Sequence, residues 1–409
     1  MKNKNGQAAI TAVILMLIIM LSAVFGASSV ALKESRVANE GANGRFSFFA
    51  AEAGTDDAVY RLRRGKIVTN SFTIILNGAS ATTTVTTVGS IKNVKSTGDY
   101  SSATRATSAQ LSNTTGVSFY FGVQVGDTGL TLGNGSMVKG NVFSNGDIKG
   151  NDEDKSRITG NAQVAGAHSI KDIRVNNGAS AHSFDECIVD GILKYVSSYG
   201  SCTASSTQTL GGDIAPQDFP ITDAQITQWT NDAAAGGTLN GLDIGSNTAA
   251  TTGPQRIIGD VTMGNSSTLT ITGTVWVTGT VTFGNSAKIR LDPINYGSLS
   301  GVLIVGKSVT VGNGALLVGT GRSGSYLMLL ATSTGTAIDI GNTASSTIFY
   351  APNGTIDTGN NLNLREATGK GLSVGNGATI TYESGLANVN FTSGPSGGWN
   401  ITGWGEIVP

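Results

Sequence analysis

The chain has 409 residues, a formal net charge of −1 and 13% charged residues, against about 25% in an ordinary globular protein. A nearly neutral chain without basic runs interleaved with aromatic residues argues against nucleic acid as a partner. Its 57 glycines are about twice the usual share, and Val, Ile, Leu and Thr recur in strand-like groups. The composition therefore predicts a folded, mainly β protein.

An uncharged apolar run follows two lysines at the start of the chain. No charged residue occurs between Lys4 and Lys33, and residues 14–20 are almost wholly aliphatic. About 20 such residues cross the hydrocarbon core of a membrane as a helix, with every backbone group bonded internally. We expect a transmembrane segment at about residues 8–31. The preceding positive charges predict a cytoplasmic amino terminus and an extracytoplasmic body.

A cleaved secretory signal is the alternative for the same run. Residues 24–26 could form a signal peptidase site before Ala27, although the apolar core of a signal usually spans only about 7–15 residues. The length of the run favours a retained helix. An uncleaved anchor that keeps Met1 is a third possibility.

Gly6 stands immediately before the apolar run, and Ala50-Ala51-Glu52-Ala53-Gly54 closes the helix that follows it. Residues 1–65 thereby resemble type IV pilin-like proteins of the PilX minor-pilin kind. The resemblance implies that a prepilin peptidase cuts between Gly6 and Gln7 and leaves the helix as an assembly stalk for contact with other pilin-like subunits. Thr11 is the fifth residue after that cut, where major pilins carry a glutamate.

The stalk helix is expected to continue through residues 33–64, with Phe46 and Phe49 near one face. Three glycines, at positions 41, 44 and 54, each cost about 1 kcal/mol in a helix interior, so a bend or local fraying is expected there.

A small antiparallel sheet is expected after the helix, in residues 66–121. Strands at 71–76 and 81–88 flank Asn77-Gly78, the strongest short hairpin signal. Residues 96–105 resemble the strand pair that follows the helix in pilin-like proteins, and residues 397–404 carry a weaker likeness.

From residue 122 to residue 409 the sequence predicts a parallel β-helix solenoid. A hydrophobic residue, Gly-Asn and small residues recur, and the spacing grows from 20 to 28, 29 and 34 residues from the second copy on, as in coils with loop insertions. Gly and Asn tolerate left-handed backbone and are expected at the corners, with threonines outward on the strands. A β-sandwich is the alternative. The six copies are 132–136, 263–267, 283–287, 311–315, 340–344 and 374–378.

Two short helical insertions are predicted within the solenoid. Pro220 and a capping Thr222 or Asp223 open the first, at residues 221–235, where Ile226 and Trp229 lie three apart. The second is expected near residues 184–199, where apolar residues recur at helical spacing.

Cys187 and Cys202 are the only cysteines. In an exported protein the simplest interpretation is one disulfide, and free thiols are the alternative. A zinc site is disfavoured because His168 and His182 do not complete a ligand pattern with them. We expect no metal and no cofactor.

No catalytic pattern is evident. The pattern of Asp152-Glu153-Asp154 is typical of a solvated loop, and a bound calcium ion is the alternative. Asp243 has no second carboxylate nearby with which it could act as a catalytic pair. The sequence predicts a non-enzymatic, membrane-anchored surface protein that displays a rigid β-helix, for which lipid, carbohydrate or another cell-surface ligand is a possible partner. Alternatives are a β-helix enzyme acting on polysaccharide and a bactofilin-like polymer-forming protein.

Overall fold

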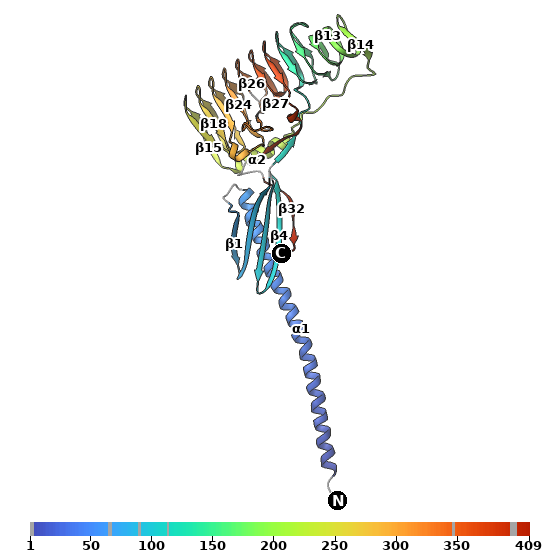
Figure 1. Ribbon diagram of the computed structural model, residues 1–409, viewed down its shortest axis with the longest axis vertical. Helices are drawn as coiled ribbons and strands as arrows, with labels where there is room; N and C mark the ends of the chain where they lie inside the picture. The colour runs from blue at the N-terminus through green and yellow to red at the C-terminus, as the bar shows by residue number, and fades with distance from the viewer. Residues whose placement is uncertain (1–3, 64–67, 89–90, 113, 346–347, 393–398) are drawn as a thin grey trace. The chain divides into compact units, whose positions relative to one another are not determined.

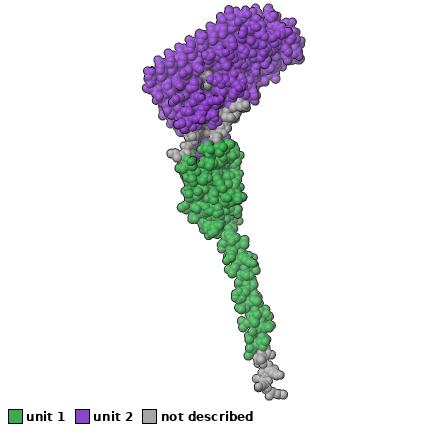
Figure 2. Space-filling view, in the orientation of Figure 1, with its two compact units in different colours: residues 1–61, 68–111, 401–409 green, residues 62–67, 112–400 purple. Residues whose placement is uncertain are grey.

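The computed structural model describes residues 4–63, 68–88, 91–112, 114–345, 348–392 and 399–409. The chain forms two compact units (Figure 2). Unit 1 comprises residues 1–61, 68–111 and 401–409, and unit 2 comprises residues 62–67 and 112–400. Residues 401–409 therefore belong to the first unit, whereas the sequence analysis assigned them to the β-helix segment.

Unit 1 consists of one long helix and a five-stranded sheet with the order β1-β2-β3-β4-β32 (Figure 1). Strands β1, β2 and β3 pair antiparallel. The last strand comes from the far end of the sequence, so unit 2 is inserted between two strands of this sheet. The elements are α1 (Lys4–Arg63), β1 (Ser71–Leu76), β2 (Ala79–Val88), β3 (Ile91–Tyr100), β4 (Ala103–Ser112) and β32 (Asn400–Ile407).

The predicted hairpin is confirmed. Asn77 and Gly78 connect β1 to β2 with φ of 49° and 82°, the left-handed pair that a two-residue turn between twisted strands requires. Ser101 and Ser102 take the same role between β3 and β4, with φ of 44° and 71°.

Helix α1 is uninterrupted across its glycines, so the local fraying expected there is wrong. Gly54 instead allows close contact with the sheet, because a Cβ there would collide with the hydroxyls of Thr83 and Ser96. On the sheet side, a Cβ on Gly98 would collide with the carbonyl oxygen of Ser47. The tertiary contact outweighs the helix penalty of about 1 kcal/mol for glycine.

Unit 2 is a stack of coils whose strands pair in parallel with the coil before and the coil after. In one coil, β19 (Val275–Val277) leads to β20 (Val281–Phe283), a Gly-Asn corner and β21 (Lys288–Leu291). Each coil thus contributes to three ladders of parallel strands, which we call the first, second and third ladders in that order.

The first ladder contains β15 (Thr238–Ile244), β17 (Gln255–Met263), β19, β22 (Gly301–Val305), β25 (Leu327–Ala331), β27 (Ile348–Thr358), β29 (Glu366–Val374), β6 (Val123–Leu132), β8 (Val142–Ser144), β11 (Ala162–Val164), β13 (Ala179–Ser198) and β14 (Thr203–Thr209). The longer of these strands bend into the second ladder, which also holds β20, β23 (Val309–Val311), β26 (Gly335–Ile340), β9 (Ile148–Lys149) and β12 (Ser169–Val175). The third ladder contains β16 (Ala249–Thr252), β18 (Thr268–Ile271), β21, β24 (Leu316–Val318), β28 (Asn363–Leu364), β30 (Thr379–Thr381), β7 (Met137–Lys139) and β10 (Arg157–Ile158).

The bending of the long strands joins the first two ladders. Because β17 and β27 each pair in both, the eight strands β17, β19, β22, β25, β27, β26, β23 and β20 form a closed parallel ring of pairings. This closed parallel barrel replaces the separate sheets expected of a regular solenoid.

The chain enters the stack in its middle. Strand β6 pairs with β29, more than 230 residues later, on one side and with β8 and β9 on the other. The chain winds from β6 out to β14 at one end, crosses to β15 at the other end, and winds back to β30 beside β7. Figure 1 shows this order, with red coils lying against teal ones in the middle of the stack.

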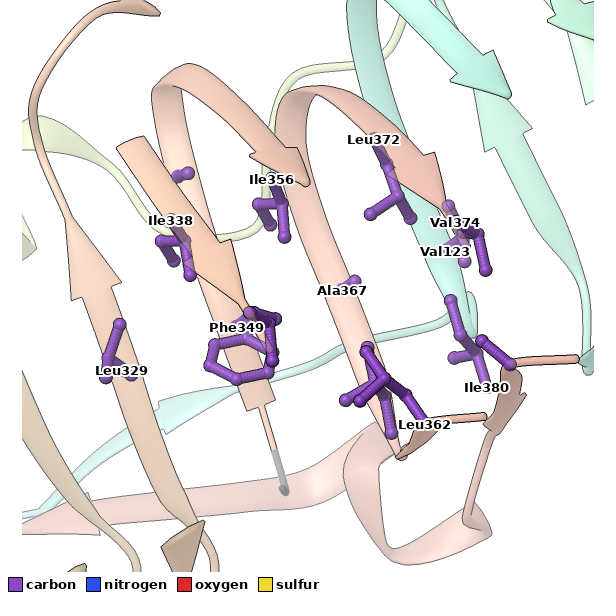
Figure 3. Close-up of a cluster of buried hydrophobic side chains, with 14 of the residues drawn as sticks. Val123, Leu329, Ile338, Phe349, Ile356, Leu362, Ala367, Leu372, Val374 and Ile380 are labelled. Carbon is purple, nitrogen blue, oxygen red and sulfur yellow. The ribbon is translucent and has the colours of Figure 1, made fainter. Parts of the chain in front are cut away.

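The interior of the stack is filled by one side chain layer per coil. Leu329, Phe349, Ala367 and Val123 follow one another along the first ladder, and all four side chains are fully buried (Figure 3). Strands β22 and β25 are buried on both faces, which explains their unbroken apolar sequences.

The outer face of the first ladder is covered by a second apolar layer. Outward residues such as Ile304 and Tyr350 pack with Trp229 and Phe391 in one cluster. The covering elements are α2 (Asp223–Ala235), β5 (Thr114–Val117), η1 (Ser384–Asn388) and β31 (Val389–Thr392), and a short helix α3 (Pro293–Tyr296) lies in one coil.

Helix α2 confirms the insertion predicted at residues 221–235, with Thr222 and Gln225 in a capping box. The helix predicted near residues 184–199 is wrong, because this segment lies in β13. Ile188 and Ile192, which indicated a helix because they lie four apart, are outside the buried core. The core residues of this part of the strand are Cys187, Val189 and Leu193.

The Gly-Asn corners stack directly on one another. The Oδ1 atom of each asparagine accepts a hydrogen bond from the backbone N–H of the asparagine one coil further on, at 2.7–3.0 Å. In this ladder the first copy in the sequence, with Asn134, comes last in space, after Asn376. Asn360 is a member that the sequence pattern missed, because Thr358 replaces the apolar residue before Gly359. The series is Asn265, Asn285, Asn313, Asn342, Asn360, Asn376 and Asn134.

The left-handed residue of each such corner follows the asparagine, so the expectation that the Gly-Asn pair itself holds positive φ is wrong. Ser286, Gly314 and Thr343 have φ of 56°, 65° and 56°. The preceding glycine has another purpose: a Cβ on Gly312 would lie 2.6 Å from the backbone of Gly284. Close stacking of coils therefore dictates glycine there.

Candidate functional site: the exposed apolar part of α1

The first part of α1 is apolar around its whole circumference. Its large side chains from Ile10 to Leu32 are all more than half exposed, and the sheet of unit 1 covers none of them. A window within Ile10–Leu62 reaches a mean hydropathy of 2.7, so the helix is long and apolar enough to cross a membrane. Such a surface cannot be left in water without a large free-energy cost.

Two serine side chains within this segment bond to the helix itself. The Ser22 hydroxyl donates to the carbonyl oxygen of Ile19 at 2.9 Å, and the Ser29 hydroxyl donates to that of Gly26 at 2.8 Å. Both bonds satisfy the hydroxyl without water, as an apolar environment requires.

The candidate processing residues Gly6 and Gln7 lie in the first turns of α1. They precede the exposed apolar residues directly. Thr11 lies among those apolar residues, and no acidic side chain occurs in the segment until Glu34.

A small groove of about 340 Å³ lies where α1 meets the sheet edge of unit 1. Glu40, Arg45 and Phe48 of the helix line it together with Arg105 and Glu406. The Arg105 guanidinium donates to the Glu406 carboxylate at 3.1 Å and so ties β4 to β32. Because both side chains are about half exposed, the pair is worth at most about 1 kcal/mol.

The two cysteines are bonded to each other. Cys187 of β13 and Cys202, just before β14, lie on adjacent coils with a Cα–Cα distance of 4.4 Å. The disulfide fastens the last coil of the stack to the coil beneath it.

A polar groove of about 430 Å³ crosses several coils of unit 2. Asp127 and Lys370 face each other across it at 3.8 Å, and Phe219 supplies a half-buried ring. Asn145 and Asn353 also line it, but each side-chain amide donates to a backbone carbonyl of the protein.

The acidic loop at residues 152–154 folds on itself. The Asp152 carboxylate accepts the backbone N–H of Asp154 at 2.9 Å and pairs with Lys155 at 3.0 Å. The hydrogen bond from the Asp154 N–H lowers the pKa of Asp152 most, and the bond from Lys155 lowers it further. Within the described part of the chain, no group of three or more His, Cys, Asp or Glu side chains could hold a metal ion.

Glu366 is the one carboxyl among the fully buried side chains of the described residues. Its Oε1 accepts the Thr368 hydroxyl, while its Oε2 has no hydrogen-bond partner in the structure. Burial raises the pKa of Glu366 well above its usual value, against the smaller lowering effect of Thr368. No sequence pattern marked this residue, because burial on both faces of β29 depends on the covering layer.

No protein-family model matches the chain, and no curated protein matches its sequence. Among solved structures, the competence-associated pilin ComZ from Thermus thermophilus is similar at 11% identity with a TM-score of 0.26. The alignment covers 90% of this chain and 98% of that one.

Proposed function

We propose that this chain is a cell-surface structural protein of the minor pilin-like or pseudopilin-like kind. The observation that carries the proposal is the division of α1: its first part is apolar and wholly exposed, and its second part packs on the sheet of unit 1. A lipid bilayer or a bundle of like helices would cover the first part.

The N-terminal residues support a route to such an assembly. Gly6 and Gln7 stand at the start of the apolar helix, where a prepilin peptidase would release the stalk. Lysines before the helix favour a cytoplasmic amino terminus, and the disulfide between Cys187 and Cys202 suits an oxidising compartment for unit 2.

We further propose that unit 2 acts as a parallel β-helix, a rigid body displayed for adhesion or another surface interaction. Its parallel coils, asparagine ladder and continuous core support rigidity. The polar groove at Asp127, Phe219 and Lys370 is the place where a surface carbohydrate would bind, because it combines hydrogen-bonding groups with one aromatic ring.

Protease treatment of intact cells tests the proposal. External protease is expected to degrade unit 2 in cells that express the wild-type chain, and shearing is expected to release part of the chain. The Gly6→Leu variant, which blocks the proposed cut, should remain in the membrane with unit 2 still accessible. Protection of unit 2 until the cells are lysed would contradict a surface location.

A further inference from the structure

The two ends of the stack leave strand edges open. Among the residues that the structure describes, the register of β14 is with β13 alone and that of β15 is with β17 alone. Figure 1 shows these strands at opposite ends of unit 2. Each edge presents backbone N–H and C=O groups that a further strand could bond.

The β14 edge lacks the usual devices that block strand pairing. No charged residue occurs between Lys194 and Asp213, no proline lies in the strand, and six of its seven residues are exposed. Natural proteins generally protect such edges with charge, proline or a covering element.

The β15 edge is nearly as free of charge. Between Asp232 and Arg256 the sole charged residue is Asp243. Leu239 and Ile258 at this end are 36% and 44% exposed, so apolar surface accompanies the open backbone.

The two edges are complementary in direction and length. All coils run the same way, so a β15 edge placed on a β14 edge would continue the parallel pairing of the stack. Both strands have seven residues. Gln208 pairs with Lys194 at one end, and Thr238 pairs with Arg256 at the other.

The register carries these two positions into one column of the first ladder. Arg256 continues through partners in successive coils to Ser180, and Lys194 of the next coil lines one outer groove together with Gln163 and Ser180. Gln208 of one copy would therefore meet Thr238 of the next. The intermediate partners in this column are Trp276, Ile304, Leu330, Tyr350, Thr368, Gln124, Phe143 and Gln163.

We propose that unit 2 binds a second copy of this chain end to end, with β14 of one copy pairing in parallel with β15 of the next. The contact is heterologous, so it leaves a free β14 and a free β15 edge at the two ends of every oligomer and can repeat. This end-to-end contact is independent of the role of α1. Whether the contact forms does not depend on processing at Gly6.

Cysteine crosslinking of the full-length chain in detergent tests the contact. The double variant Gln208→Cys/Thr238→Cys is expected to give a series of disulfide-linked dimers, trimers and higher species under mild oxidation. Mass spectrometry should find the 208–238 linkage between chains, with the native Cys187–Cys202 bond intact. Each single variant should give only background dimer.

Adding Ser206→Lys to the double variant should lower the crosslinked fraction by at least about fivefold, because it puts charge on the edge strand. Thr282→Lys, on an exposed strand position two coils in from the β15 edge, is the matched control and should change nothing. Strong dimer from Gln208→Cys alone would show antiparallel pairing of two β14 edges and overturn the proposal. Absence of the 208–238 linkage at high protein concentration, with circular dichroism unchanged, would also overturn it.

Discussion

Single residues in the corners carry strain that a substitution can relieve. Thr343 is β-branched and holds φ of 56°, a conformation that costs a non-glycine residue about 1–2 kcal/mol. We expect Thr343→Gly to raise the free energy of unfolding by about 0.5–1 kcal/mol, since the greater chain entropy of glycine offsets part of the gain. Urea denaturation followed by circular dichroism measures it.

The neighbouring corner provides the reverse test. Gly314→Thr should lower the free energy of unfolding by about 1 kcal/mol or more, because it puts a β-branched residue at φ of 65°. If Thr343→Gly and Gly314→Thr changed the free energy of unfolding in the same direction and by the same amount, positive φ would not explain the choice of residue at the corners.

Glu366 predicts a pH dependence of stability. Its pKa in the folded state is raised, so its contribution to stability is fully present below the unfolded pKa of about 4.3 and is lost as the pH rises toward the folded pKa. The slope reaches at most about 1.4 kcal/mol per pH unit. Glu366→Gln keeps an acceptor for Thr368 and removes the ionisation.

As the pH rises from 5 to 8, the free energy of unfolding of the Glu366→Gln variant should therefore increase relative to that of the wild type. Urea midpoints at the two pH values, converted with a common m value, measure the difference. Parallel pH profiles of the two proteins would show that Glu366 does not titrate in this way.

At the scale of the element, the spacing between coils depends on glycine. A Cβ on Gly312 would lie 2.6 Å from the Gly284 backbone, which cannot move aside without disturbing the ladder. We expect Gly312→Ala to cost about 2 kcal/mol or more. Gly212→Ala is the matched control, because a Cβ there meets no atom within 4 Å. Thermal unfolding compares them, and similar melting temperatures would refute the packing argument.

The disulfide is expected to hold the last coil in place. Cys202→Ser should lower the protection of β14 amides against hydrogen exchange, because a bond that closes a 15-residue separation contributes about 3 kcal/mol. Exchange mass spectrometry should show the loss in β14 and unchanged protection in β20 and β21. Uniform loss across unit 2 would mean that the bond stabilises the whole stack instead.

Elements with local signals were predictable from the sequence, and those decided by distant contacts were not. Asn77-Gly78 specified its hairpin, and Pro220 with a capping residue at Thr222 or Asp223 indicated the start of α2. The segment 184–199 could not be assigned correctly, because its apolar spacing fits a strand face as well as a helix face. Asn360 was missed because the ladder needs its side chain and not the apolar residue before it.

At the scale of the whole molecule, the order of coils was beyond the reach of the sequence. All corners carry nearly the same residues, so no local feature states that β6 lies beside β29 or that Asn134 follows Asn376. The insertion of unit 2 between β4 and β32 also depends on a strand pairing across most of the chain. By contrast, the uncharged run before Lys33 was sufficient to predict the exposed part of α1.

We propose above that this exposed apolar helix is a processed assembly stalk. The decisive experiment is to determine the amino-terminal residue of the mature protein by sequencing chains purified from cell envelopes. We expect a start at Gln7. A start at Ala27, which would remove most of the apolar segment, or an intact Met1 would contradict it.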